Sequence, residues 1–200
     1  MTERHTDLNQ LLQHIWDQIH KGAADPAHPY HSPAFGTLGS NGPNVRTIIL
    51  RRAELEARSL CFHSDRRAQK INEIQKHPRV ALHFWNSDSR EQLRITGNAT
   101  VHFDDQIANQ LWQHSRPKSL ITYVKPTTPG TKVDQPESGI VGNFQSGNVS
   151  MSDVEVGRQH FAVVCTQVDE IDFLQLHNEG NCRAYFQWES GRYEGAWLIP

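Results

Sequence analysis

The chain has 200 residues, 36% of them hydrophobic, and a formal net charge of −2 at pH 7. This length predicts a single domain over residues 1–200, and the hydrophobic share suffices for one core with polar loops. A net charge so close to zero argues against general attraction to nucleic acids or membrane surfaces, so any anion site must be a local cluster of cations.

The polar N-terminus shows no signal peptide, and no apolar run approaches the length of a transmembrane helix. The three cysteines, Cys61, Cys165 and Cys182, are odd in number and widely spaced, which fits a reducing compartment. Because Cys61 and Cys165 sit in apolar, strand-like runs, we interpret them as buried, unreactive thiols. We therefore expect a soluble cytoplasmic protein with neither nucleic-acid nor membrane partners.

The N-terminal part of the chain predicts a helix, a loop and a hairpin. Apolar residues recur at helical spacing over residues 6–21, and Gly22 can end this N-terminal helix. Residues 23–33 contain three prolines and are expected to form a loop. Ala34–Leu50, with the turn SNGP inside it, is expected to form a hairpin.

The stretch Asn44–Pro78 organises the rest of the chain. In order, it predicts a strand at 45–50, a polar turn at 53–58, a strand at 60–62 and a helix capped by Ser64-Asp65 and stopped at His77-Pro78. Arg66, Arg67 and Lys70 crowd the predicted start of this helix, where backbone N–H groups and the helix dipole already favour an anion. Cations at a helix start work against the helix dipole unless an anion is bound there. Their placement therefore predicts a phosphate site, and a solvated basic surface is the alternative.

The remaining chain is mostly strand. It predicts strands at 79–85, at 92–103 with a break or a bulge at Gly97, at 184–188 and at 196–199, and one long or two consecutive strands over 160–176. It also predicts a helix at 104–114 capped by Asp104 and a long loop over 118–157. The sum is a mainly antiparallel β protein with roughly six or seven strands and two or three helices, either a barrel or a sandwich.

Several catalytic motifs are missing from the sequence. It contains no HExxH, CxxC, GxSxG or P-loop pattern. The twelve histidines are scattered, so no metal site is predicted. What remains is a phosphate-ready helix start beside basic strands and aromatic and amide residues, which suits a phosphorylated, planar cofactor such as a flavin.

Six segments, in matching order and spacing, resemble the pyridoxamine 5′-phosphate oxidase family over roughly residues 34–200. They are RTIILR (46–51), FHSDRRAQKI (62–71), HPRVALHF (77–84), QLRITGNA (92–99), HSRP (114–117) and the closing runs IDFLQL, CRAYF and AWLIP. The resemblance implies a mainly β (α+β) fold, the antiparallel FMN-binding split β-barrel with two to three flanking helices. It also implies a homodimer that binds FMN at the subunit interface and acts on a small molecule, phosphorylated in the oxidases themselves.

The resemblance also implies which residues bind the cofactor. They are Arg46, Thr47, Ile48, Arg51, Phe62, His63, Arg66, Arg67, Lys70, Gln92 and Arg183. In this alignment Arg66 and Arg67 hold the FMN phosphate, and Arg183 comes from the partner subunit. Because Arg46 and Arg51 are an odd number of residues apart, a regular strand would point them to opposite faces. We therefore expect the strand to bulge, twist or end near Arg51.

The chain departs from the oxidases on the substrate side. Where they carry Arg-x-His-x-Arg, residues 179–183 read EGNCR, so only Arg183 is kept, and Leu174 stands where a tryptophan is usual. Trp112 and Arg116 match a tyrosine and an arginine that bind the substrate phosphate, although SRP is also typical of a helix end before a proline. The resemblance thus favours the oxidase-related flavoproteins over the oxidase itself.

Three functions stay open from the sequence, and no catalytic residue is named. The first is an FMN-dependent oxidoreductase, oxidase or reductase, of unknown substrate, with a genuine pyridoxamine/pyridoxine 5′-phosphate oxidase as the alternative within this class. The second is a non-catalytic module that binds a flavin or haem. The third is a structural barrel with an unused site.

Overall fold

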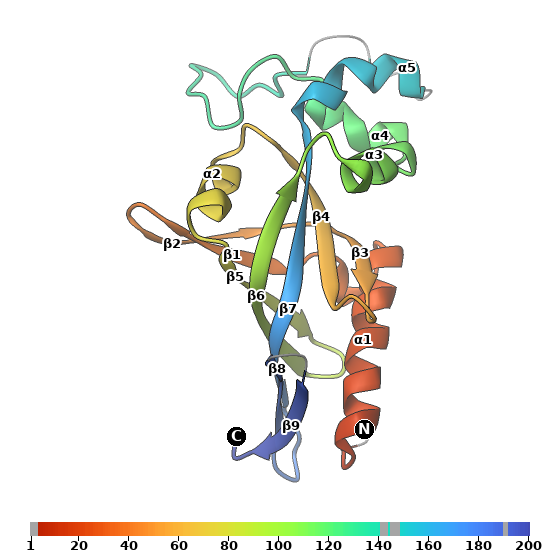
Figure 1. Ribbon diagram of the computed structural model, residues 1–200, viewed down its shortest axis with the longest axis vertical. Coiled ribbons are helices and arrows are strands. Elements are labelled where there is room, and N and C mark those ends of the chain that lie inside the picture. Colours follow the sequence, from red (N-terminus) through yellow and green to blue (C-terminus); the bar gives the residue numbers. More distant parts are fainter. Residues whose placement is uncertain (1–3, 141–143, 145–148, 190–191) are drawn as a thin grey trace.

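The computed structural model describes residues 4–140, 144, 149–189 and 192–200 (Figure 1). Its nine strands form one antiparallel sheet in the order β2-β1-β5-β6-β7-β4-β3, and β8 joins β7 to β9. The strands are β1 (Ala34–Gly39), β2 (Gly42–Thr47), β3 (Leu50–Glu54), β4 (Ser59–Asp65), β5 (Arg79–Asn86), β6 (Glu91–His102), β7 (Phe161–Gln175), β8 (Cys182–Glu189) and β9 (Arg192–Leu198). The prediction of a mainly β, antiparallel fold is confirmed, with more strands than expected.

The helices flank this sheet on different sides. They are α1 (Leu8–Ala24), α2 (Gln69–Lys76), α3 (Gln106–Gln113), α4 (Pro117–Leu120) and α5 (Met151–Val154), with 3-10 turns η1 (Pro29–His31), η2 (Ile121–Tyr123) and η3 (Glu155–His160). Figure 1 shows α1 along one side of the sheet, α2 on the other, and α3, α4 and α5 gathered at the top. Within the described residues, no helix is long and apolar enough to cross a lipid bilayer.

Strand β7 connects most of the sheet. Its 15 residues pair with β4 at one end, with β8 at the other, and with β6 along most of its length. The register of β6 against β7 shifts between Thr96 and Gly97, and a Cβ at Gly97 would lie 2.0 Å from the carbonyl oxygen of Gln167. The predicted bulge at Gly97 is confirmed, because only glycine lets the two backbones approach this closely.

Two apolar clusters stabilise the fold. In the larger one, the buried stripe of α1, including Leu11, Ile15 and Ile19, packs with the buried residues of the sheet. In the smaller one, the rings of Trp112 and Tyr123 each lie 5.1 Å from the ring of Phe161. This smaller cluster docks the α3–α5 region onto the end of β7 and β4.

The predicted start of the second helix is wrong by several residues. Ser64 and Asp65 belong to β4, where Asp65 pairs with Phe161 of β7, so the ladder holds both residues extended. Helix α2 begins only at Gln69, and its N-cap, Ala68, has no side-chain hydrogen bond. Arg66 and Arg67 therefore lie in the turn between β4 and α2, and only Lys70 lies in the first helical turn.

The predicted strand at 45–50 is two strands. β2 ends at Thr47, Ile48 donates its N–H to the carbonyl of Pro33 at 3.0 Å, and β3 begins at Leu50. The β3–β4 register shifts again between Leu50 and Arg52. The expectation that the strand is interrupted near Arg51 is confirmed, because a regular strand over this stretch does not form.

The segment 118–157 is not an unbroken loop in its described part. It contains η2, α5 and part of α4 and η3, because Leu120, Tyr123 and Val154 are buried in the smaller cluster. Helix α3 is capped by Asp105 rather than Asp104, since the Asp105 carboxylate accepts the Ala108 N–H at 2.9 Å.

The interpretation of Cys61 and Cys165 as separate thiols is also wrong. Cys61 of β4 lies directly opposite Cys165 of β7, and the two form a disulfide with a Cα–Cα distance of 4.1 Å. This pairing depends on strand neighbours that are 104 residues apart in the sequence, so spacing alone does not predict it.

Candidate functional site

Arg46, Arg67 and Lys70 form a basic cluster where β2, the end of β4 and α2 meet. The Lys70 ammonium donates to Ser64 Oγ of β4 at 3.2 Å. Burial lowers the pKa of Lys70, and Arg46 lowers it further, although neighbouring carboxylates oppose this. The positive charges of Arg46 and Lys70 thus lie close together, and a bound anion would relieve their repulsion.

Glu73 of α2 anchors this basic cluster. Its carboxylate is only 6% exposed and accepts hydrogen bonds from Thr37 Oγ1 at 2.6 Å, Asn44 Nδ2 at 2.6 Å and Arg46 Nη2 at 3.0 Å. Burial alone would raise the pKa of Glu73, but these hydrogen bonds outweigh burial and hold the pKa below its usual value. Arg46 is thereby fixed against α2, next to Lys70.

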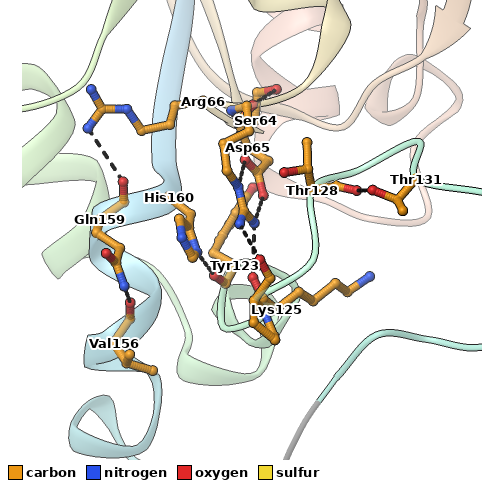
Figure 2. A network of polar contacts seen from close by, with 12 residues as sticks. Ser64, Asp65, Arg66, Tyr123, Lys125, Thr128, Thr131, Val156, Gln159 and His160 are labelled. Atoms are coloured by element: carbon orange, nitrogen blue, oxygen red, sulfur yellow. Dashed lines mark hydrogen bonds and ion pairs between the residues drawn. The ribbon is translucent and has the colours of Figure 1, made fainter.

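Arg67 bridges the end of β4 and the loop after η2. Its guanidinium donates to both carboxylate oxygens of Asp65, at 3.0 and 2.7 Å, and to the carbonyls of Lys125 and Pro126, at 2.9 and 3.0 Å. Figure 2 shows Asp65 and Lys125 facing each other across this bridge. An arginine has five N–H donors, so these four bonds leave one N–H on Nη1 for an anion.

Arg66 points the other way. Its guanidinium lies 4.6 Å from the centre of the Phe103 ring, 3.7 Å from Asp104 and within 3.4 Å of the Gln159 carbonyl. Figure 2 shows this side chain directed toward Gln159, away from Asp65. The structure thus brings Arg46, Arg67 and Lys70 together and separates Arg66 from them.

A hollow of about 270 Å³ lies on the other side of this turn; we call it the His63 hollow. Its lining includes Arg51, His63, His114 and Arg116, so the predicted substrate residue Arg116 and two predicted cofactor residues share it. Among the described residues, His63 Nε2 is one of few buried side-chain polar atoms without a hydrogen-bond partner. Burial, and then the charge of Arg51, lower the pKa of His63 to about 3, so this imidazole is neutral at pH 7.

Tyr123 is a buried residue of the smaller apolar cluster. Burial raises its pKa, Arg51 opposes that rise and Asp65 adds to it, which places both charged groups within electrostatic reach of the Tyr123 hydroxyl. His63 and Tyr123 also flank the same ring, that of Phe161, at 4.8 and 5.1 Å between ring centres.

The side chains of four other predicted residues do not line the His63 hollow. The Phe62 side chain is buried and packs on Phe35, and Ile48 is buried in the same cluster. Trp112 is 4% exposed and packs on Phe161, so its ring does not line the His63 hollow. Thr47 is exposed at the end of β2.

Gln92 and Arg183 lie in a different part of the surface. Gln92 Oε1 lies 3.2 Å from His83 Nε2, and Arg183 binds both oxygens of Asp172 at 3.1 and 2.8 Å. His83 and Asp172 line a second hollow of about 450 Å³ along β5, β6, β7 and β8, which we call the Tyr185 hollow after another of its residues. Within this one chain, Gln92 and Arg183 therefore contact residues of the Tyr185 hollow, whereas Arg51 and His63 line the His63 hollow.

Sequence reasoning missed two buried groups. It did not single out Glu73, which accepts a hydrogen bond from Gln69 at 2.8 Å. These two residues are four apart in a predicted helix, a spacing that places them on the same face and could have indicated the contact. It also missed the cluster of His5, His14 and Glu91, whose donor atoms all lie within 4.8 Å of one another. No spacing signal could have found that cluster, because Glu91 lies 77 residues beyond His14.

Parts of the sequence match known proteins. Residues 11–103 match the family described as "Pyridoxamine 5'-phosphate oxidase, FMN-binding domain". A pyridoxine/pyridoxamine 5′-phosphate oxidase 2 of Arabidopsis thaliana is 27% identical over 194 residues, which cover 91% of this chain and 93% of that protein. A pyridoxine/pyridoxamine 5′-phosphate oxidase of Thermosynechococcus vestitus is 36% identical over 92 residues, covering 46% of this chain and 41% of that protein.

Solved structures share the fold at lower identity. A pyridoxamine 5′-phosphate oxidase-related, FMN-binding protein of Nostoc punctiforme has a TM-score of 0.74 at 18% identity and covers 98% of this chain and 100% of its own. PhzG of Burkholderia lata, solved with tetrahydrophenazine-1-carboxylic acid, has a TM-score of 0.70 at 13% identity, with 98% and 94% covered. Residues 11–103 therefore match this family, and the chain shares the split-barrel fold of these solved structures.

Proposed function

We propose that this protein binds FMN and acts as an FMN-dependent oxidoreductase. The observation that carries the proposal is the basic cluster at the start of α2, together with the His63 hollow and its unpartnered imidazole nitrogen. FMN needs cations and N–H groups for its phosphate, and apolar packing with a few hydrogen bonds for its ring. When bound, the flavin supplies the redox chemistry by accepting and passing on a hydride.

Charge counting supports a phosphate at the basic cluster. The three cations of the cluster face the carboxylates of Asp65 and Glu73, which leaves one positive charge uncompensated. The N-cap of α2, Ala68, makes no side-chain hydrogen bond, so no cap side chain competes with a phosphate oxygen for the N–H groups at the start of the helix. Lys70 and the free N–H of Arg67 would hold the phosphate, and Arg46 would stabilise its charge from the Glu73 side.

The neutral imidazole of His63 suits the other end of the cofactor. Its Nε2 is buried and without a partner among the described residues, so it can donate to or accept from a ring atom. Arg51 and Arg116 add positive charge to the rim of the His63 hollow, which favours an anionic substrate group there. We assign these two arginines to substrate binding and charge stabilisation.

A homodimer accounts for the second group of predicted residues. Gln92 and Arg183 contact residues of the Tyr185 hollow, whereas Arg51 and His63 line the His63 hollow, so one flavin would meet both sets if they came from two copies. The surface around the Tyr185 hollow also exposes Val45, at 70%. Sedimentation should therefore show a dimer, and a monomer that keeps full FMN affinity would contradict this part.

Oxidation of pyridoxine or pyridoxamine 5′-phosphate is the second candidate. The similarity to the Arabidopsis thaliana oxidase over nearly the whole of both chains favours it. The sequence EGNCR at 179–183 weighs against it, since Arg183 pairs with Asp172 and the upstream arginine and histidine are absent. Assay with each phosphate ester, following pyridoxal phosphate formation, separates this candidate from oxidoreduction of another substrate and from a non-catalytic flavin or haem module.

The test begins with the visible spectrum of the purified protein and the mass of the ligand released by heat. We expect a flavin spectrum and FMN. The variant Lys70→Gln should weaken FMN binding about 10- to 100-fold, the scale of one charge-assisted hydrogen bond. Lys76→Gln, an exposed lysine at the other end of α2, is the matched control and should leave affinity unchanged. A colourless protein that also fails to bind added FMN would overturn the proposal.

A further inference from the structure

His5, His14 and Glu91 form a compact cluster outside the basic cluster and the His63 hollow; we call it the His–Glu cluster. His5 precedes α1, His14 lies within α1, and Glu91 is the first residue of β6. His5 Nε2 lies 3.3 Å from Glu91 Oε1, and His14 Nε2 lies 3.2 Å from Glu91 Oε2. Three groups of metal-ligand type from three separate segments thus converge on one point.

The buried carboxylate at the centre lacks a permanent positive partner. Glu91 is 1% exposed, and within the described part of the chain its ion pairs are with the two histidines alone. Ser89 Oγ donates to Glu91 Oε2 at 3.0 Å. A buried carboxylate needs charge compensation, and neutral imidazoles supply hydrogen bonds but no net charge. A bound cation would provide the missing charge.

The spacing of the donor atoms fits a metal ion. Zinc binds histidine nitrogen at about 2.0–2.1 Å and carboxylate oxygen at about 2.0–2.2 Å, so tetrahedral ligands lie roughly 3.3 Å apart. The two histidine–carboxylate distances, 3.3 and 3.2 Å, are of this size. All donor atoms lie within 4.8 Å, so a small rotation of His5, which stands outside α1, completes the set.

We propose that His5, His14 and Glu91 bind a divalent transition-metal ion, Zn²⁺ in the first place. Two imidazoles and one carboxylate are a known ligand set for this ion, with a fourth position left for water. The side chains of His5 and His14 are 19% and 32% exposed, which leaves a path for the ion and for that water. Ser89 would orient the carboxylate of Glu91 through its hydrogen bond to Oε2.

The metal would fasten the N-terminal segment and α1 to the sheet. Cys182 Sγ of β8 already lies 3.7 Å from the His5 carbonyl oxygen, and the His5 ring packs edge-on against Phe173 of β7 at 5.5 Å. His5 is therefore held against β7 and β8 while His14 is carried by α1. A metal between them and Glu91 would add a further link among three segments that these polar contacts and the larger apolar cluster already hold together.

The experiment is a calorimetric titration of Zn²⁺ into the full-length protein after treatment with EDTA and removal of the chelator. We expect one Zn²⁺ per chain. His14→Ala and His5→Ala should each weaken binding at least tenfold, because each removes one of three ligands. His20→Ala is the matched control, since His20 is an exposed histidine of the same helix outside the cluster. Circular dichroism checks that each variant is folded.

Two results would overturn the proposal. One is equal Zn²⁺ affinity in the parent and in the folded variant His5→Ala, whose substituted position lies outside any helix or strand. That result would mean that the cluster is only a hydrogen-bond network. The other is equal loss in His20→Ala and His14→Ala, which would mean binding spread over surface histidines. The visible absorption spectrum of the protein with Co²⁺ in place of Zn²⁺ is a second measurement, because an intense band reports four- or five-coordinate binding. Neither measurement depends on FMN, so this proposal and the flavin proposal fail independently.

Discussion

The α2 side and the α1 side of the molecule treat a buried carboxylate in opposite ways. Glu73 on α2 is paired with Arg46 and lies beside Lys70, so positive charge is in excess there. Glu91 is bonded to two imidazoles and a hydroxyl, so negative charge is in excess there whenever the imidazoles are neutral. The sign of the uncompensated charge indicates the ligand: a phosphate beside α2, a metal cation beside α1.

The largest expected effect is the loss of the permanent partner of Glu73. Arg46→Met should lower the free energy of unfolding by about 3–5 kcal/mol, because it leaves a buried carboxylate without its cation. Arg79→Met is the control: Arg79 is half-exposed and pairs with Asp169 and Glu170, so its loss should cost no more than about 1 kcal/mol. Urea unfolding measures both. Equal losses would mean that Glu73 is not the electrostatic anchor described above.

Acid should reveal the buried imidazole of His63. The pKa of His63 is about 3 in the folded chain and 6.5 when unfolded, so between these values the unfolded state binds more protons and stability falls as pH falls. From pH 7 to pH 4 this loss should be about 3 kcal/mol. His63→Phe should not show this part of the pH dependence.

The matched control for acid is His20→Phe, at an exposed position. Urea unfolding of the three proteins at pH 7 and pH 4 makes the comparison. If the parent and His63→Phe lose equal stability between these pH values, the imidazole is not buried in a neutral form.

Zn²⁺ should stabilise the folded protein only by binding to the His–Glu cluster beside α1. At a free Zn²⁺ concentration about 100 times its Kd, the free energy of unfolding should rise by about 2.7 kcal/mol. The rise should vanish on adding EDTA and in His14→Ala, and it should persist in Lys70→Gln. A rise that Lys70→Gln abolishes would place the metal beside α2 and break the comparison.

The smallest expected effect is a gain. Lys70 is desolvated and lies next to Arg46, so Lys70→Met should stabilise the FMN-free protein by about 1 kcal/mol while weakening FMN binding. Thermal unfolding with and without FMN measures both terms. A destabilised Lys70→Met protein would show that the ammonium is already satisfied by Ser64 and the nearby carboxylates.

Local patterns explain what the sequence could predict. The amphipathic α1, the strands β5, β6 and β7 and the bulge at Gly97 follow from residues that are neighbours in the chain. The basic residues around α2 also lie within one stretch, and three of them do meet. A single domain over residues 1–200 and a cytoplasmic location stay predictions.

Strand pairing decided most of what the sequence could not predict. Asp65 looked like a helix cap, but β7 holds it in a ladder, and the same pairing brings Cys61 to Cys165. Arg66 and Arg67 are adjacent, yet Asp65 and the loop at Lys125 bind only Arg67. In each case the competing partner is distant in the sequence, so tertiary contacts override the local signal.

The Cys61–Cys165 bond makes the chain from β4 to β7 a covalent ring. Residues 126–138, inside that ring, are exposed and lie outside helix and strand, where proteases cut most readily. One cut there opens the ring without releasing a fragment, and the molecule gains only the mass of a water. The nicked protein would run as a single band on a non-reducing gel and as two bands once a thiol is added.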